Sequence, residues 1–160
     1  MDSTPAQKIG ISLLTWCIVL FGAVTIGFVL RETDGRIYPV IQDFRVSEVA
    51  NHDSGVTISG TMDKRRECYF RELVAYARYD DDEYPVAVPL EFDAAPVVSR
   101  SAIAQSWGPW VIELGKDYRD AEVSLYTRHS CHSLWDTSSQ IARFSIRKEN
   151  DSATIIRGTQ

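Results

Sequence analysis

The chain has 160 residues, with 22 acidic and 17 basic side chains and a formal net charge of −5 at pH 7. Charges of both signs are interspersed, which argues against the basic face that a nucleic-acid-binding surface requires. Aromatic residues make up 11% of the chain and β-branched residues are plentiful, which argues against disorder. We therefore expect a folded protein that binds no nucleic acid.

An uncharged stretch from Ile9 to Leu30 follows a short N-terminal tail, residues 1–8. As a helix this stretch would be about 33 Å long, enough to cross the hydrocarbon core of a bilayer. A signal peptide would be shorter and would end in a small-residue cleavage site, and a buried helix of a soluble protein would be shorter or have a polar face. We predict an uncleaved, single-pass transmembrane helix over residues 9–30, which acts as a signal anchor and contacts the lipid bilayer.

Two small residues of this segment, Ala23 and Gly27, are spaced so that they would share one face of a helix. Such a pair allows a second helix to approach closely. A homo-oligomer formed through the transmembrane helix is therefore one hypothesis, and packing within a larger membrane assembly is another.

Two signals disagree about the side of the membrane on which the rest of the chain lies. One basic residue precedes the helix and three follow it closely, so the positive-inside rule places the following domain in the cytoplasm. Cys68 and Cys131 are the only cysteines beyond the helix, and such a pair suits a disulfide in an oxidising compartment. Closing that loop could stabilise the fold by about 4 kcal/mol. The alternative is two reduced, buried thiols; we predict a disulfide and a periplasmic or extracellular domain.

About 130 residues remain after the helix, enough for one domain with its own core. We expect a juxtamembrane linker at 31–39, an antiparallel β-sandwich at 40–148 and a flexible C-terminal tail at 149–160. Short alternating segments separated by turns indicate about seven strands, and a slip of the apolar phase between Phe70 and Leu73 indicates a bulge. Residues 93–107 are predicted to be a loop, and Pro89 makes its strand an edge strand. The expected strand segments are 46–49, 55–62, 67–79, 84–92, 110–114, 121–126 and 142–147.

The mainly β pattern after one helix suggests an immunoglobulin-like sandwich, with Cys68 in an early strand and Cys131 in a late one forming a bridge between the two sheets. The match is imperfect. The tryptophan expected one strand after the first cysteine is absent, and His129 stands where a tyrosine corner would place tyrosine. We therefore predict the broad shape of this fold and not a true immunoglobulin domain.

His129, Cys131 and His132 are the tightest cluster of candidate metal ligands. Strand alternation directs His132 away from Cys131, and a cysteine in a disulfide cannot bind a metal ion. No nucleophile elbow, phosphate-binding loop or zinc-protease motif is found in the sequence. We expect no catalytic residue, cofactor or metal, with His129 and His132 as weak metal candidates.

Three tryptophans, Trp107, Trp110 and Trp135, lie at or beside predicted turns. The simpler interpretation is that they fill the core at the ends of the sandwich. The alternative is an exposed aromatic patch that binds a partner, because tryptophan, tyrosine and arginine dominate interface hot spots.

Three segments together carry a family resemblance: Gly60–Phe70, Gly108–Trp110 and His129–Thr137. Their order and spacing resemble small, uncharacterised, single-pass membrane proteins of tailed bacteriophages and prophages. The resemblance implies a location in the host envelope and a framework role for Cys68, Cys131 and Trp110. It implies no activity.

These observations predict a membrane-anchored, non-enzymatic β-sandwich that binds an unknown protein partner at the cell envelope, with its helix supplying location and effective concentration. An envelope metal-binding protein or enzyme that uses His129, Cys131 and His132 is one alternative. A structural subunit of a larger membrane assembly is the other.

Overall fold

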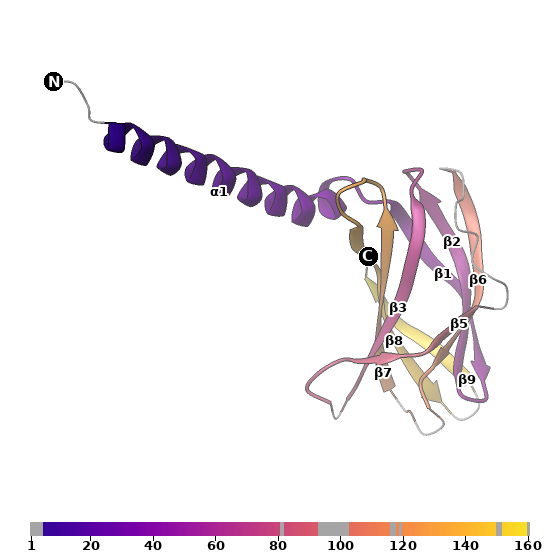
Figure 1. Ribbon diagram of the computed structural model, residues 1–160. Helices are drawn as coiled ribbons and strands as arrows, with labels where there is room; N and C mark the ends of the chain where they lie inside the picture. The colour runs from indigo at the N-terminus through magenta and orange to yellow at the C-terminus, as the bar shows by residue number, and fades with distance from the viewer. Residues whose placement is uncertain are drawn as a thin grey trace.

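A computed structural model describes residues 5–80, 82–92, 103–115, 118, 120–149 and 152–159. A long N-terminal helix, α1 (Pro5–Ile37), leads directly into a domain of antiparallel strands (Figure 1). The strands of the described chain are β1 (Ile41–His52), β2 (Gly55–Lys64), β3 (Tyr69–Tyr79), β4 (Val86–Val88), β5 (Leu90–Phe92), β6 (Ala104–Glu113), β7 (Asp120–Ser130), β8 (Thr137–Glu149) and β9 (Ser152–Thr159).

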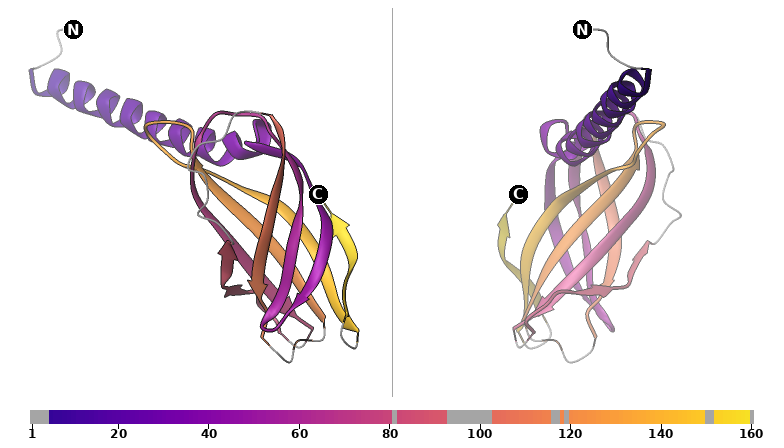
Figure 2. Two further views of the ribbon diagram at one scale, coloured as in Figure 1. Left: turned by 90° about the vertical axis from the view of Figure 1, so that its right-hand side faces the viewer. Right: turned by 60° about the vertical axis from the view of Figure 1, so that its left-hand side comes forward.

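The strands form two sheets that pack face to face (Figure 2). The first sheet has the order β1-β2-β6-β5 and the second the order β4-β3-β7-β8-β9, with every neighbouring pair antiparallel. The first eight strands follow the ABED and C′CFG arrangement of immunoglobulin-type sandwiches, and β9 extends the second sheet. The predicted fold class is therefore confirmed.

The core lies between the sheets because both present their apolar side chains inward. Ala121, Val123 and Leu125 of β7 are buried, whereas the intervening side chains are more exposed, as the two-residue period predicts. Burying a valine, leucine or isoleucine side chain contributes about 1.5–3 kcal/mol, so this inner layer dominates the stability of the domain. Among the described residues, the largest fully buried aliphatic side chains are Val40, Val56, Ile58, Ile112, Val123, Leu125 and Ile146.

Helix α1 projects from one end of the sandwich (Figure 1). Most of its large apolar side chains from Leu13 onward are exposed. Its segment Ser12–Ile37 is long and apolar enough to cross a membrane, and none of the most apolar window is buried within the protein. The helix is longer than the membrane span predicted at 9–30, since it begins at Pro5 and runs on to Ile37. Residues 31–37 are therefore a helical stem, and the expected linker at 31–39 is reduced to a short turn before β1.

The segment 84–92 does not form the single returning strand that we expected. Instead β4 pairs with β3 at the edge of one sheet and β5 pairs with β6 at the edge of the other. Pro89 lies between them, where the chain crosses from one sheet to the other, and its carbonyl accepts a hydrogen bond from the Glu113 amide at 3.0 Å. The predicted edge position of this proline is confirmed, since proline lacks the donor that a central strand needs.

The C-terminal residues do not form the flexible tail expected over 149–160. Residues Ser152–Thr159 form β9, which pairs with β8 and covers what would otherwise be the edge of the second sheet. Ala153 and Ile155 pack against the core. The sequence pattern missed this strand because its alternation is weak and an edge strand needs little apolar surface. The predicted bulge in β3 is confirmed as a register shift between Phe70 and Glu72.

The predicted disulfide links Cys68 to Cys131, but it does not bridge the two sheets. Cys68 immediately precedes β3 and Cys131 immediately follows β7, and these strands are neighbours in one sheet, with Tyr69 opposite Ser130. The cysteines occupy the next pair of positions along the ladder, 4.7 Å apart between Cα atoms, which is the spacing of a non-hydrogen-bonded antiparallel pair. The disulfide therefore fastens two strand ends together at the end of the sandwich where α1 enters.

Candidate functional site

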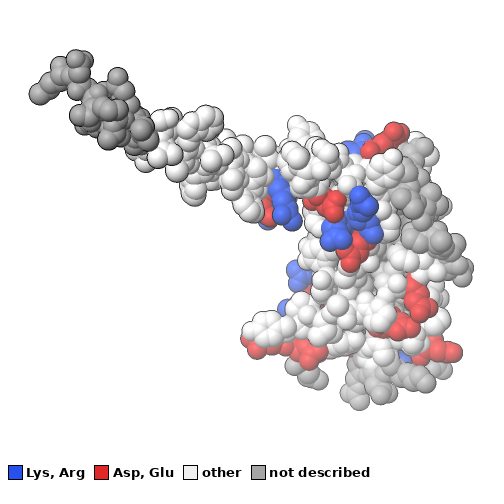
Figure 3. All heavy atoms as spheres, viewed as in Figure 1, with Lys and Arg blue, Asp and Glu red and all other residues white. Residues whose placement is uncertain are grey.

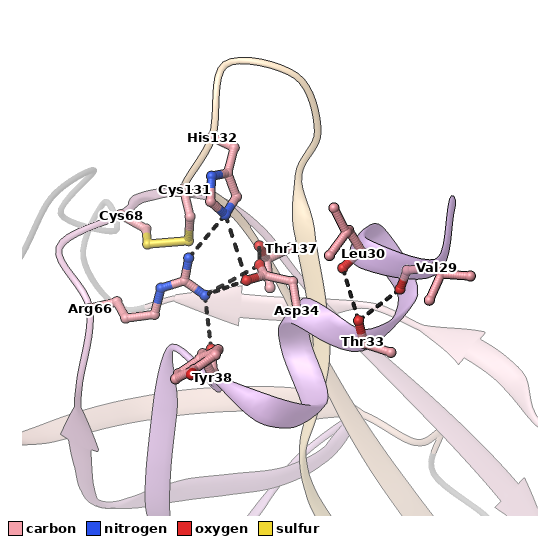
Figure 4. A network of polar contacts seen from close by, with 10 residues as sticks. All are labelled: Val29, Leu30, Thr33, Asp34, Tyr38, Arg66, Cys68, Cys131, His132 and Thr137. Atoms are coloured by element: carbon pink, nitrogen blue, oxygen red, sulfur yellow. Dashed lines mark hydrogen bonds and ion pairs between the residues drawn. A yellow bond between two sulfur atoms is a disulfide. The ribbon is translucent and has the colours of Figure 1, made fainter. Parts of the chain in front are cut away.

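The end of α1 is attached to the sandwich by a compact polar network around Asp34 (Figure 4). Its carboxylate accepts hydrogen bonds from Arg66 Nη1, at 3.1 Å to Oδ1 and 3.3 Å to Oδ2, and from the Thr137 hydroxyl. The Asp34 side chain is 13% exposed and that of Arg66 is 24% exposed. An ion pair so shielded from water is worth more than one on an open surface, and removal of one partner leaves the other charge poorly solvated.

Arg66 also connects the helix stem to the loop that follows β7. Its Nη1 donates to the Tyr38 carbonyl at 2.8 Å, and its Nη2 lies 3.2 Å from His132 Nε2. Because a guanidinium group only donates hydrogen bonds, this contact requires His132 Nε2 to be unprotonated. The contact between His132 Nε2 and Asp34 Oδ1, at 3.6 Å, is longer than a hydrogen bond and is a packing contact.

A glycine allows the helix to come close enough for this network to form. A Cβ atom at Gly35 would lie 2.6 Å from the Ser138 carbonyl oxygen, a distance that real Cβ atoms do not adopt. The adjacent Asp34 can therefore reach Thr137 at the start of β8. Cys68 and Cys131 lie beside the residues that hold Asp34, two positions after Arg66 and one before His132 (Figure 4). Together Asp34, Gly35, Arg66, His132, Thr137 and the disulfide form what we call the junction.

A second buried polar group lies next to the junction. The side chain of His129 is 3% exposed and Lys64 is 5% exposed, and Lys64 Nζ donates to the Cys68 carbonyl at 3.2 Å. Burial, reinforced by the positive charges of Lys64 and Arg66, lowers the pKa of His129 to about 4. His129 is therefore neutral near pH 7, and its ring packs edge-on against Phe70 at 5.8 Å between centroids.

The candidate metal ligands are not brought together. His129 points into the sandwich, His132 lies on the outside of the junction, and Cys131 is consumed by the disulfide. No group of three or more histidine, cysteine, aspartate or glutamate side chains gathers at any point of the described chain. The nearest charged neighbours of the two histidines include Arg66 and Lys64, which repel a cation.

Two of the three candidate partner-binding tryptophans belong to the core. Trp107 is 3% exposed and stacks on Phe44 with 4.3 Å between ring centroids, while Trp110 lies 4.4 Å from Trp107. Both are in β6, Trp110 as expected and Trp107 in place of the loop expected at 93–107, and Gly108, with a φ of 89°, precedes a cis Pro109 between them. This irregularity, opposite the register shift in β2, turns both indoles inward, so Trp107 is not available to a partner.

Trp135 has a different environment. It is half-buried in the loop between β7 and β8, with its ring 4.8 Å from that of His132. The neighbouring Leu134 is 82% exposed. The two small helix residues of the sequence analysis, Ala23 and Gly27, lie on the open part of α1, where a Cβ added at Gly27 would meet nothing within 4 Å.

Sequence reasoning missed Asp34, Gly35, Arg66 and Thr137, because residues 31–39 are predicted to be a juxtamembrane linker. A usable signal would have been the helix-compatible spacing of residues 31–37, which contain no proline. Nothing in the sequence pairs Asp34 with residues 32 and 103 positions away.

Comparison of the chain with protein-family models, curated proteins and solved structures finds no match. The class of the molecule is therefore given by its own architecture: an immunoglobulin-type sandwich carried on a long apolar helix. The resemblance to phage membrane proteins remains a prediction.

Proposed function

We propose that this protein is a non-enzymatic membrane anchor for one β-sandwich, which it presents on the outer side of a cell membrane to bind a protein partner. The single observation that carries this proposal is the continuity of α1 with the junction. An apolar helix long enough to span a bilayer ends in a stem that packs closely on the sandwich at Gly35 and is held there by Asp34, which Arg66 and Thr137 bind. A flexible tether would need none of these contacts.

The disulfide supports the proposed side of the membrane. Disulfides persist in oxidising compartments and are rare in the cytosol. Cys68 and Cys131 lie at the end of the domain nearest the helix. An oxidising outer compartment would therefore keep the disulfide of the junction intact. An envelope location is also what the resemblance to phage membrane proteins implies.

The outer face of the second sheet offers the surface that we propose for the partner. An open groove of about 490 Å³ crosses β3 and β7, and its walls include Tyr76, Tyr126 and Arg128. The two tyrosine rings meet edge to face at 5.7 Å, which holds them in place before a partner binds. Tyrosine and arginine are enriched among the residues that carry binding energy at protein interfaces.

A photo-crosslinking amino acid at position 126, in the full-length protein in native membranes, tests this proposal. We expect an adduct of defined mass at position 126, and none at the matched control position 47, an exposed residue of β1 in the other sheet. Equal adducts at both positions, or none at either, would contradict a partner-binding face on the second sheet.

A further inference from the structure

Among the described residues, five large apolar side chains are exposed where α1 meets the sandwich, three on the sandwich and two on the helix stem. Tyr69 is 62% exposed, Ile103 59% and Leu134 82%, and on the helix stem Ile37 is 63% and Tyr38 67% exposed. These five come from separate segments of the chain, yet the strand register places all of them at this end. The outer face and the opposite end of the sandwich hold Tyr84, Val86 and Tyr126. Because these five side chains lie together at the end of α1, the helix end is suited to a partly apolar neighbour.

The loop between β7 and β8, residues 131–136, lies beside the last turns of α1 and extends in the direction of the helix (Figure 2). His132 and Thr137, on its two sides, both contact Asp34. Asp34 is four residues beyond Leu30, the end of the uncharged stretch, which is about 6 Å along the helix axis. The headgroup layer on each side of a bilayer is about 5–7 Å thick. If α1 crosses a bilayer, this loop is therefore level with the lipid headgroups.

We infer that the loop at residues 131–136 inserts its tip, Leu134, into the interface of the same bilayer that α1 crosses, with Tyr69 and Tyr38 beside it. This inference rests on the proposed membrane anchor. The geometry favours lipid as the partner of this loop, because a bilayer crossed by α1 would have its headgroups at the level of the loop. Tyrosine is enriched at the headgroup level, where its ring lies in an apolar layer and its hydroxyl in a polar one.

The charges near the end of α1 are also compatible with a lipid bilayer as the neighbour of this end. From Ser12 to Leu30 α1 carries no charge, and in Figure 3 basic and acidic side chains lie at its last turns. Arg31 and Arg36 are exposed on this stem and can pair with lipid phosphates, whereas Asp34 faces the sandwich. Two points of contact, α1 and the loop, would fix the tilt of the sandwich against the membrane, and the junction would hold the two points together.

Depth-dependent fluorescence quenching in vesicles of phosphatidylcholine with one-fifth phosphatidylglycerol tests this inference on the full chain. The native Cys17, which is free and exposed, carries the environment-sensitive label in one sample and reports on the anchor. In a Cys17→Ser background, Leu134→Cys carries the label in a second sample and Asp53→Cys in a third. Asp53 is an exposed residue of the turn between β1 and β2, at the opposite end of the sandwich. Labelling without reductant keeps the Cys68–Cys131 disulfide intact.

We expect lipids with a quencher near the headgroup to quench position 134 several-fold more strongly than position 53, and lipids with a quencher deep in the acyl chains to quench position 17. Quenching at position 17 with equal quenching at 134 and 53 would overturn the interfacial loop and leave the anchor intact. Absence of quenching at position 17 would overturn the anchor and the loop together. Ser133→Cys serves as the second variant if the new thiol at 134 exchanges with Cys131.

Discussion

The two ends of the sandwich are stabilised by different kinds of interaction. The end that receives α1 has a disulfide, an ion pair between Asp34 and Arg66 with 13% and 24% side-chain exposure, and exposed apolar side chains. The far end relies on open ion pairs such as Arg147 with Asp120, whose side chains are 55% and 29% exposed. Exposed pairs are screened by water and salt and contribute little. The shielded and covalent links are placed where any force on the anchor enters the domain.

The largest expected effect comes from the aromatic cluster that supports the helix end of the first sheet. Trp107→Ala removes an indole stacked between Phe44 and Trp110 and leaves a cavity, so we expect a loss of about 3–5 kcal/mol in the free energy of unfolding. Urea denaturation monitored by circular dichroism measures the loss. Tyr84→Ala, at a side chain that is 71% exposed near the far end, is the control and should change stability by no more than about 0.5 kcal/mol. Equal losses would contradict the assignment of Trp107 to the core.

Removal of the disulfide is the next largest change. The double variant Cys68→Ser with Cys131→Ser frees two adjacent strand ends and restores the entropy of a long loop to the unfolded chain, which should cost about 2–4 kcal/mol. Thermal unfolding of the oxidised, reduced and double-variant proteins measures this cost, and the reduced and variant forms should agree. If reduction leaves the melting temperature unchanged, the disulfide does not stabilise this end.

Neutralisation of Asp34 tests the junction itself. Asp34→Asn keeps the shape of the side chain but leaves Arg66 half-buried without its counter-charge, which should destabilise the contact between helix and sandwich by about 1–3 kcal/mol. Spin labels at Cys17 and at Asp53→Cys report the distance between helix and domain, and the distribution should broaden.

Asp120→Asn, which breaks the ion pair with Arg147 at the far end, is the matched control. It should leave the distance distribution unchanged and cost no more than about 1 kcal/mol. An Asp34→Asn distribution as narrow as that of the unmodified protein would mean that the shielded ion pair does not hold the helix.

The effect that is smallest for a change of one pH unit is a pH dependence that originates at the helix end. The unfolded chain binds a proton at His129 near its ordinary pKa of 6.5, whereas the folded domain holds the pKa at about 4. Unfolding therefore takes up a proton between these values, and stability falls as the pH is lowered from 6.5 towards 4, by at most about 1.4 kcal/mol per pH unit. His129→Gln should remove this part of the slope, while His52→Gln, at the exposed far turn, should keep it. Identical slopes in both variants would show that His129 is not buried in its neutral form.

The sequence predicted the features that depend on local pattern and failed where distant segments meet. The alternation of Ala121, Val123 and Leu125 identified β7, and the cysteine pair identified the disulfide. The alternation shows which side chains face inward, but it does not show which strands are neighbours. The disulfide is therefore predicted between the two sheets, whereas it links two neighbouring strands of one sheet. Trp107 is predicted to lie in a loop at 93–107, whereas β6 already begins at Ala104 and continues through an irregularity at Gly108 and Pro109. The sequence does not predict the junction, because Asp34, Arg66 and Thr137 are far apart in the chain and meet only in the folded domain.

Protease and thiol accessibility in bacterial spheroplasts tests most directly the claim that α1 presents the sandwich outside the membrane. Added protease should digest the domain and leave a membrane-embedded fragment that contains Cys17. Alkylation under acid quench should find Cys68 and Cys131 unreactive until an impermeant reductant is added from outside. Full protection of the domain until lysis, with both cysteines alkylated as free thiols, would contradict the proposed orientation and the disulfide together.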